Sequence, residues 1–173
     1  MNSKSSMAAI LGAIFILAGG SSRAAYAAPP TDACTVLTPA RVSAILGASV
    51  SADKEPPSPF PGSHPTSHPT CWWSQPGVSI MTSKRAFLDI FGPIGRFSPV
   101  DRFNNGKTPV HGVTKTPISG IGDDAYYITS GGLGTGLNVR KGSSAFQIRV
   151  YGFSLDQIKA MEKTLAQDVL AKL

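Results

Sequence analysis

The sequence is poor in the side chains that most often carry catalysis or bind metal ions. Its 173 residues include two cysteines, three histidines and ten acidic residues. Two cysteines set far apart do not form a zinc motif by themselves. The basic residues are scattered rather than clustered, which argues against a nucleic-acid partner. Beyond the N-terminal segment, no apolar run approaches the roughly 20 residues that a transmembrane helix needs.

The first 27 residues have the pattern of a secretory signal peptide. Lys4 gives a positive start, residues 7–18 form a short apolar run, and Ala25-Tyr26-Ala27 fits a small-x-small cleavage site. The apolar run is about 12 residues long, which is too short for a membrane anchor. We therefore expect residues 28–173 to form one mature domain that is secreted or periplasmic and has no membrane span.

The two cysteines, Cys34 and Cys71, are expected to form a disulfide, because an exported domain matures in an oxidising compartment. Closing a loop of about 37 residues stabilises a fold by roughly 3–4 kcal/mol in the chain-entropy model. A free reactive thiol or a metal thiolate is the alternative. Asp32 stands close before Cys34, which argues against lipid attachment at this cysteine.

Two segments carry both capping and periodicity signals for helices. Thr38 and the proline after it suit the start of a helix that Gly47 ends. Ser154 and Gln157 form a capping-box pattern before an amphipathic stretch that runs to the C-terminus. We expect this closing helix to lie on a sheet. Residues 49–70 are rich in proline, which predicts an exposed irregular loop.

Residues 120–150 predict an antiparallel meander of three strands. Residues 125–129 are rich in aromatic and β-branched side chains, and residues 137–140 and 145–150 alternate apolar with polar. The short connections favour antiparallel pairing, because a parallel return needs a long crossover. The residues expected to face the core are Leu137, Val139, Phe146, Ile148 and Val150. Those expected to face water are Asn138, Arg140, Gln147 and Arg149.

The middle of the chain carries weaker signals. Residues 71–74 and 78–82 predict a hairpin, and Ser83 can cap a short helix that ends at Gly92-Pro93. Residues 94–118, which are rich in turn-forming residues, predict an irregular loop. The whole chain then predicts a single α+β domain with an antiparallel sheet of about five strands and helices packed on one side. The expected order of elements is α-β-β-α-β-β-β-α.

Aromatic and basic residues supply the candidates for ligand binding. One tryptophan of the Trp72-Trp73 pair should pack under the disulfide, which leaves the other to stack on a ligand. Phe97 and Phe103 alternate with basic residues such as Arg102, a set that an anionic or aromatic ligand can use. The candidates are Trp72, Phe97, Arg102 and Phe103. Core packing, or a surface loop pinned by its phenylalanines, is the alternative for these residues.

The histidines support two other interpretations. His64 and His68 belong to a tandem Ser-His-Pro-Thr repeat and can bind a divalent metal, although an exposed loop without metal explains the repeat as well. His111 with Asp123 or Asp124 can serve a hydrolase, but no nucleophile-elbow pattern surrounds them. We therefore assign no catalytic residue and expect no cofactor.

Three motifs occur in a fixed order along the chain: Cys34-Thr-Val-Leu-Thr, then Cys71-Trp72-Trp73, then Gly120-Ile-Gly-Asp-Asp-Ala-Tyr126. In this order they resemble a family of secreted bacterial proteins of unknown function, whose best-known members are actinobacterial lipoproteins. The resemblance covers residues 34–173 and implies a compact α+β domain with a cysteine bridge outside the cytoplasm. It implies no catalytic residues, and this chain differs in having no lipid-attachment cysteine.

These observations favour a non-enzymatic binding or interaction module of the cell envelope, whose partner is a ligand or an envelope protein. A hydrolase using His111 and a metal-binding protein using His64 and His68 are the alternatives.

Overall fold

Seven strands and four helices make up the part of the chain that the structure, a computed structural model, describes: residue 30 and residues 32–53, 69–131 and 134–173. The helices are α1 (Ala33–Val36), α2 (Pro39–Leu46), α3 (Pro99–Asn105) and α4 (Leu155–Leu170). The strands are β1 (Ser51–Asp53), β2 (Thr70–Ser74), β3 (Arg85–Ile90), β4 (Val113–Ile118), β5 (Asp124–Ser130), β6 (Gly134–Lys141) and β7 (Ser144–Tyr151). The predicted signal peptide, His64 and His68 lie outside the described residues.

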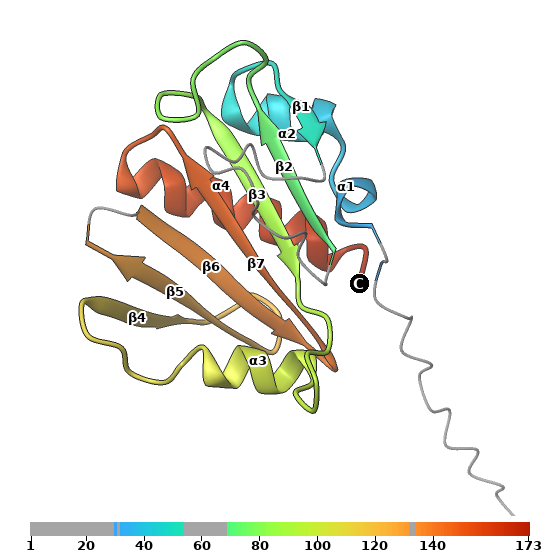
Figure 1. The fold of residues 1–173 in the computed structure, drawn as a ribbon, viewed down its shortest axis with the longest axis vertical. Coiled ribbons are helices and arrows are strands. Elements are labelled where there is room, and N and C mark those ends of the chain that lie inside the picture. Colours follow the sequence, from blue (N-terminus) through green and yellow to red (C-terminus); the bar gives the residue numbers. More distant parts are fainter. Residues whose placement is uncertain (1–29, 31, 54–68, 132–133) are drawn as a thin grey trace, which may run out of the picture.

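All seven strands pair antiparallel in one sheet, in the order β1-β2-β3-β7-β6-β5-β4 (Figure 1). Strands β1 to β3 form one half of the sheet, and β4 to β6 form the other. The last strand, β7, lies between β3 and β6 and joins the two halves. The predicted meander of 125–150 is confirmed as β5, β6 and β7.

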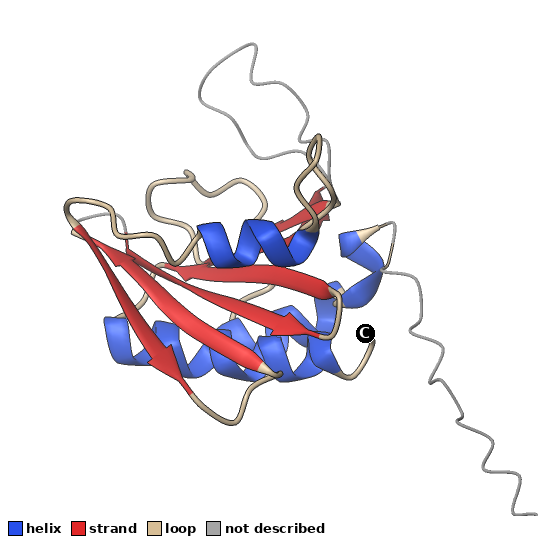
Figure 2. Cartoon of the chain, turned by 90° about the horizontal axis from the view of Figure 1, so that it is seen from below, coloured by secondary structure: helices blue, strands red, loops and turns tan. Residues whose placement is uncertain are grey.

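Helices cover both faces of the sheet, which corrects the prediction that they pack on one side only (Figure 2). Helix α4 packs against β6, β7 and α2, and α1 packs against β2 and β3. Helix α3 lies on the opposite face, where it contacts β6 and β7. Its Phe103 is fully buried and packs with Tyr126 and Ala145 in a second, smaller core.

The main core lies between the sheet and the layer of α1, α2 and α4. Cys34 and Cys71 form the predicted disulfide, which links α1 to β2. Trp73 is fully buried in the same cluster, as expected for one of the two tryptophans. The disulfide indicates an extracytoplasmic location, because cytosolic thiols are kept reduced. No helix within the described ranges is both long enough and apolar enough to cross a membrane.

The predicted helix ends are confirmed where capping residues gave the signal. Thr38 accepts a hydrogen bond from the Arg41 backbone N–H, 3.2 Å away, at the start of α2. Gly47 ends that helix with φ 58°, the left-handed conformation that glycine adopts without strain. Ser154 and Gln157 form the expected capping box of α4.

Two predictions for the middle of the chain are wrong. The helix expected after Ser83 is instead β3, which is the true hairpin partner of β2 in place of residues 78–82. The alternation of buried and half-buried residues along β3 shows period two, and this pattern outweighed a short helical stripe. Residues 94–118 contain α3 and β4, so this segment is not an irregular loop. The missed signal for α3 was its Ser98–Asp101 capping box with a proline at the first turn.

The Gly120-Ile-Gly motif forms a turn in which the two glycines meet different surroundings. Both have positive φ, but a Cβ on Gly122 would lie 2.4 Å from the Arg140 carbonyl oxygen, whereas a Cβ on Gly120 would meet nothing within 4 Å. We expect Gly120→Ala to lower the free energy of unfolding by about 1 kcal/mol through backbone strain alone. Gly122→Ala should cost about 2 kcal/mol more, because backbone must also move. Urea denaturation measures the free energy of unfolding of both variants. Equal losses would show that a side chain at residue 122 does not clash with the backbone of β6.

Candidate binding face

One face of the sheet carries polar and aromatic side chains where the other carries the apolar core. We call it the polar face. It is the face opposite α4, and its central residues are Trp72 of β2, Arg85 and Phe87 of β3, Gln147, Arg149 and Tyr151 of β7, and Asn138 of β6. Side chains along a strand alternate between the two faces of the sheet. Because Leu88 and Ile148 point into the main core, the residues before and after each of them point to the polar face.

Strand register brings these residues together from distant parts of the sequence. Phe87 pairs with both Trp72 and Arg149, and Arg85 pairs with Tyr151. The arginine on β7 is therefore a diagonal neighbour of the arginine on β3. On this sheet face, such neighbours are about 7–8 Å apart at the backbone, within reach of long side chains.

The sequence predicted that Asn138, Gln147 and Arg149 face water, and this is only partly correct. They do point away from the α4 core, but Asn138 is only 3% exposed and the other two are half-buried. The sheet face towards α4 is apolar. We therefore expected the alternate residues, whose side chains point to the other face, to be in contact with water. Sequence periodicity identifies the face of a residue and not how deeply that face is covered.

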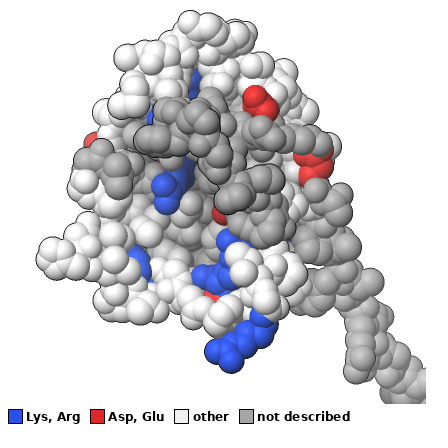
Figure 3. Space-filling model, viewed as in Figure 1, with Lys and Arg blue, Asp and Glu red and all other residues white. Residues whose placement is uncertain are grey.

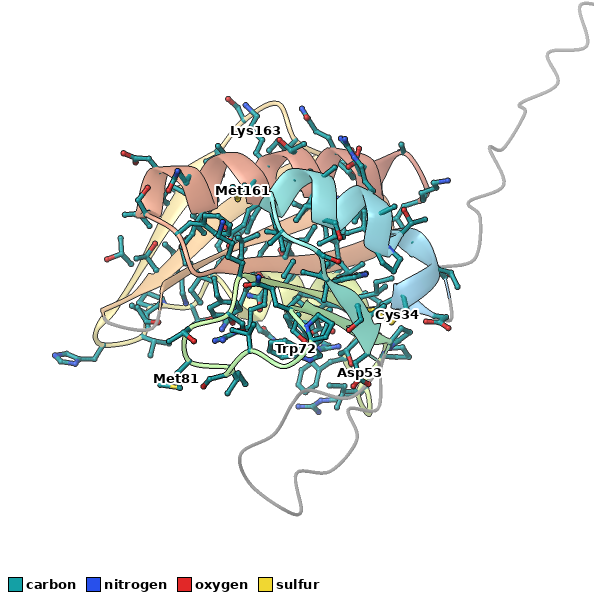
Figure 4. The ribbon with its side chains drawn as sticks, turned by 90° about the horizontal axis from the view of Figure 1, so that it is seen from above. Cys34, Asp53, Trp72, Met81, Met161 and Lys163 are labelled. Carbon is teal, nitrogen blue, oxygen red and sulfur yellow. A yellow bond between two sulfur atoms is a disulfide. The ribbon has the colours of Figure 1, made fainter. Side chains whose placement is uncertain are left out.

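Three aromatic rings line one side of the polar face. The ring centroids of Trp72 and Phe87 are 4.4 Å apart, and Trp72 stacks on Tyr151 with its centroid 6.5 Å away. Figure 4 shows Trp72 on the side of the sheet away from α4. All three residues are half-buried, so each ring keeps part of its surface accessible. Such rings offer flat apolar area to a ligand at low conformational cost.

A chain of hydrogen bonds runs beside the rings and ends in an unused donor. The Arg149 Nε donates to Gln147 Oε1 at 2.9 Å, and Gln147 Nε2 donates to Asn138 Oδ1 at 3.0 Å. The Asn138 Nδ2 is buried and has no hydrogen-bond partner among the residues that the structure describes. A buried donor left unsatisfied costs about 1–3 kcal/mol, so it requires an explanation such as a bound group.

Arg85 provides a second unused donor on the same face. Its guanidinium carbon lies 4.4 Å from the centroid of the Tyr151 ring, and its Nε is buried and meets no hydrogen-bond partner within the described ranges. Burial lowers the pKa of the Arg85 guanidinium from its ordinary value, and the nearby Tyr151 partly offsets this. The cation is thus partly desolvated, and it gains more from an anion than an exposed arginine would.

Basic side chains gather over the middle of this face and beside α3 (Figure 3). Asp89 of β3 is the acidic residue among the central strands, and it is already engaged in an interaction of its own. At the α3 end, a cavity of about 200 Å³ is lined partly by Lys107 and Asp124, but these two form an ion pair with each other. Two buried donors without a partner among the described residues, on Arg85 and Asn138, lie on this face, and a third, the Nε1 of Trp73, lies in the main core.

A second hollow, of about 300 Å³, lies on the other side of the molecule between α1, α2 and the end of α4. Arg41 and Asp168 line it and form an ion pair with each other, with Nε and Oδ2 2.7 Å apart. Both side chains reach solvent, and such exposed pairs have little unused binding capacity.

The structure separates the four ligand-binding candidates that the sequence suggested. Trp72 lies at the centre of the polar face. Arg102 donates to the Gly92 carbonyl oxygen at 3.0 Å and stacks on Phe91, and Phe103 is fully buried under α3. Phe97 lies in the turn before α3 and is 41% exposed. Of the four, Trp72 contacts the central cluster of rings.

The groups considered for catalysis have other partners. His111 is exposed in the turn before β4. Asp123 accepts a hydrogen bond from the Gly142 backbone N–H at 2.7 Å and pairs with Arg140, so it supports the β6–β7 turn rather than its own glycine turn. Asp124 pairs with Lys107. In the part of the chain that the structure describes, no group of three or more potential ligands is placed to hold a metal ion.

Sequence reasoning did not identify Arg85, Phe87 or Tyr151 as site residues. Their signal was available in the alternation of residues 85–90 and 144–151, but the first of these segments was interpreted as a helix. Searches for similarity to protein-family models, to curated proteins and to solved structures gave no match.

Proposed function

We propose that this protein is a non-enzymatic binding module of the cell envelope that takes its ligand on the polar face. A single observation carries the proposal: a buried hydrogen-bond donor, the Nε of Arg85, has no partner among the described residues and lies beside half-buried aromatic rings on that face. A sheet face that served only as a surface would leave such donors in water. A face that served only as a core would carry apolar residues, as the α4 face does.

The location follows from two independent features. The leader-like residues 1–27 support export, and the Cys34–Cys71 disulfide suits an oxidising compartment such as the periplasm or the outside of the cell. The motif order that resembles secreted envelope proteins of unknown function points the same way.

The aromatic rings give the first test of this proposal. We expect fragments from a screened library to shift the amide resonances of β2, β3 and β7 in ¹H–¹⁵N spectra of the mature protein. Trp72→Ala should weaken binding of such a fragment at least about tenfold, which corresponds to about 1.4 kcal/mol of lost contact. Phe97→Ala removes an exposed ring near α3 and should leave the affinity within about twofold.

The unliganded melting temperature of each variant separates lost binding from lost folding. If no fragment perturbs these strands, or if perturbations map to the α4 face, the polar face is not the binding surface. Equal losses in the two variants would also contradict the proposal, because they would point to a general effect of removing aromatic rings.

A further inference from the structure

The centre of the polar face offers donors and almost no acceptors. The oxygens of Gln147 and Asn138 already accept hydrogen bonds within the Arg149 chain. The unused groups are N–H donors: the Nε of Arg85 and the Nδ2 of Asn138. The carboxylate of Asp89, opposite Gln147 on the same face, is engaged in an interaction of its own. A ligand that uses the free donors must therefore bring acceptor atoms.

Arg85 and Arg149 stand at diagonal positions on the adjacent strands β3 and β7. Arg149 is held by its bond to Gln147, and its side chain lies across Gly136, where a Cβ would come within 2.9 Å of its Cγ. Gly136 thus leaves room for the arginine to extend over β6. Arg85 is held against Tyr151. Both guanidinium groups are oriented before any ligand arrives, which reduces the entropy lost on binding.

We propose that the polar face binds an organic anion with a flat apolar part, namely a small carboxylate whose oxygens are held by Arg85, whose ring lies on Trp72, and which is further attracted by the charge of Arg149 on the next strand. This inference rests on the proposed function and names its ligand class. Arginine pairs with carboxylates through paired N–H bonds, and a carboxylate compensates the charge of a guanidinium that burial has partly desolvated. The rings of Trp72, Phe87 and Tyr151 supply the apolar surface beside this charge.

Three probes test the two parts of the ligand separately: benzoate has both the ring and the charge, benzamide has the ring alone, and acetate has the charge alone. In ¹H–¹⁵N titrations of the mature protein, we expect benzoate to shift amides of β2, β3 and β7 with a millimolar dissociation constant. Benzamide and acetate should bind at least about tenfold more weakly. Raising the salt concentration should weaken benzoate and leave benzamide unchanged.

Single substitutions show which arginine side chains attract the carboxylate of benzoate. Arg85→Gln should raise the benzoate dissociation constant at least about tenfold, the change expected when a charge-assisted pair is lost, and Arg149→Gln about fivefold, because it removes an attracting charge without a direct pair. Arg96→Gln removes the same charge from an exposed position near α3 and serves as the matched control, with an expected change below about twofold.

Three other results would overturn the anion inference, and each can be distinguished from failure of the proposed function. If benzamide binds as tightly as benzoate on the same strands, the face binds rings without regard to charge, and only the anion inference fails. If Arg96→Gln weakens benzoate as much as Arg149→Gln does, the attraction comes from net charge and not from a site. If benzoate shifts only residues outside β2, β3 and β7, the anion site does not exist. The proposed function itself then stands or falls on the fragment screen.

Discussion

Replacing both cysteines, Cys34→Ala together with Cys71→Ala, is expected to lower the free energy of unfolding by roughly 3–4 kcal/mol, the value for closing a long loop in the unfolded chain. The cysteines are 37 residues apart, so reduction frees a large segment that includes α1, α2 and β1. Cys71 is fully buried, and its truncation adds a smaller packing loss. Urea denaturation of the wild type and the double variant measures the difference.

Reduction of the wild type with dithiothreitol provides the control for this experiment. It should reproduce most of the loss without any change of sequence, and it should leave the double variant unchanged. A loss below about 1 kcal/mol in both experiments would show that the bond is not needed for the fold. The argument for an oxidising compartment would then lose its structural support.

Glu162→Gln is expected to remove most of the pH dependence of stability between pH 4.5 and pH 8. Glu162 lies on α4 and is fully buried; its Oε1 accepts a hydrogen bond from the Val150 backbone N–H at 3.1 Å, while Oε2 is buried without a partner. Burial raises the pKa of Glu162 from 4.5 to about 8, against the lowering effects of that hydrogen bond, Arg149 and Lys159. Tyr127 also faces this carboxyl, and burial, with the charge of Glu162, raises the pKa of Tyr127 to about 12.

Stability falls with rising pH because the unfolded chain loses the Glu162 proton at a lower pH than the folded protein does. Between pH 4.5 and pH 8 the unfolded chain has ionised this carboxyl, while the folded protein still binds the proton. Stability is therefore complete below pH 4.5, falls as the pH rises towards 8, and stays low above it. Because one pKa unit corresponds to about 1.4 kcal/mol, the rise of the Glu162 pKa from 4.5 to about 8 makes this fall on the order of 5 kcal/mol.

Denaturation curves measured from pH 4 to pH 9 check this prediction. The Glu162→Gln variant should differ from the wild type by a nearly pH-independent amount below pH 4.5 and become relatively more stable as the pH rises. Asp156→Asn removes a carboxylate from the exposed first turn of the same helix and should keep the slope of the wild type. Parallel curves for Glu162→Gln and the wild type would refute a raised pKa at this position.

The parts of the fold that the sequence predicted are those with a local chemical signal. Thr38, Gly47 and the Ser154–Gln157 pair mark helix ends through hydrogen bonds that a few neighbouring residues can make. The disulfide followed from cysteine count and compartment. The meander followed from two-residue periodicity in residues 125–150.

The missed elements depend on partners far away in the sequence. Strand β3 has aromatic and aliphatic residues that fit a helical stripe as well as an alternation of two, and its pairing with β2 and β7 decides between the two patterns. Strand β4 contains a proline, and proline normally argues against a strand; at the sheet edge, Pro117 is tolerated because it need not donate to a neighbour.

The candidate site was hidden for the same reason. Trp72 was identified because a pair of tryptophans beside a cysteine stands out in a sequence. Arg85 and Arg149 carry no such mark, because they are far apart in the chain and become neighbours only through strand register. Glu162 looked like part of the polar side of an amphipathic helix, and its burial depends on the way α4 crosses β7.

The central position of β7 makes the order of synthesis matter for this protein. Until residues 144–151 leave the ribosome, β3 and β6 each lack a neighbour, and the two halves of the sheet have nothing to hold them together. Unpaired strands of this kind readily join other chains. The nascent protein therefore benefits from remaining unfolded until residues 144–151 are available, and Arg85 and Arg149 come to lie on neighbouring strands only at that final step of assembly.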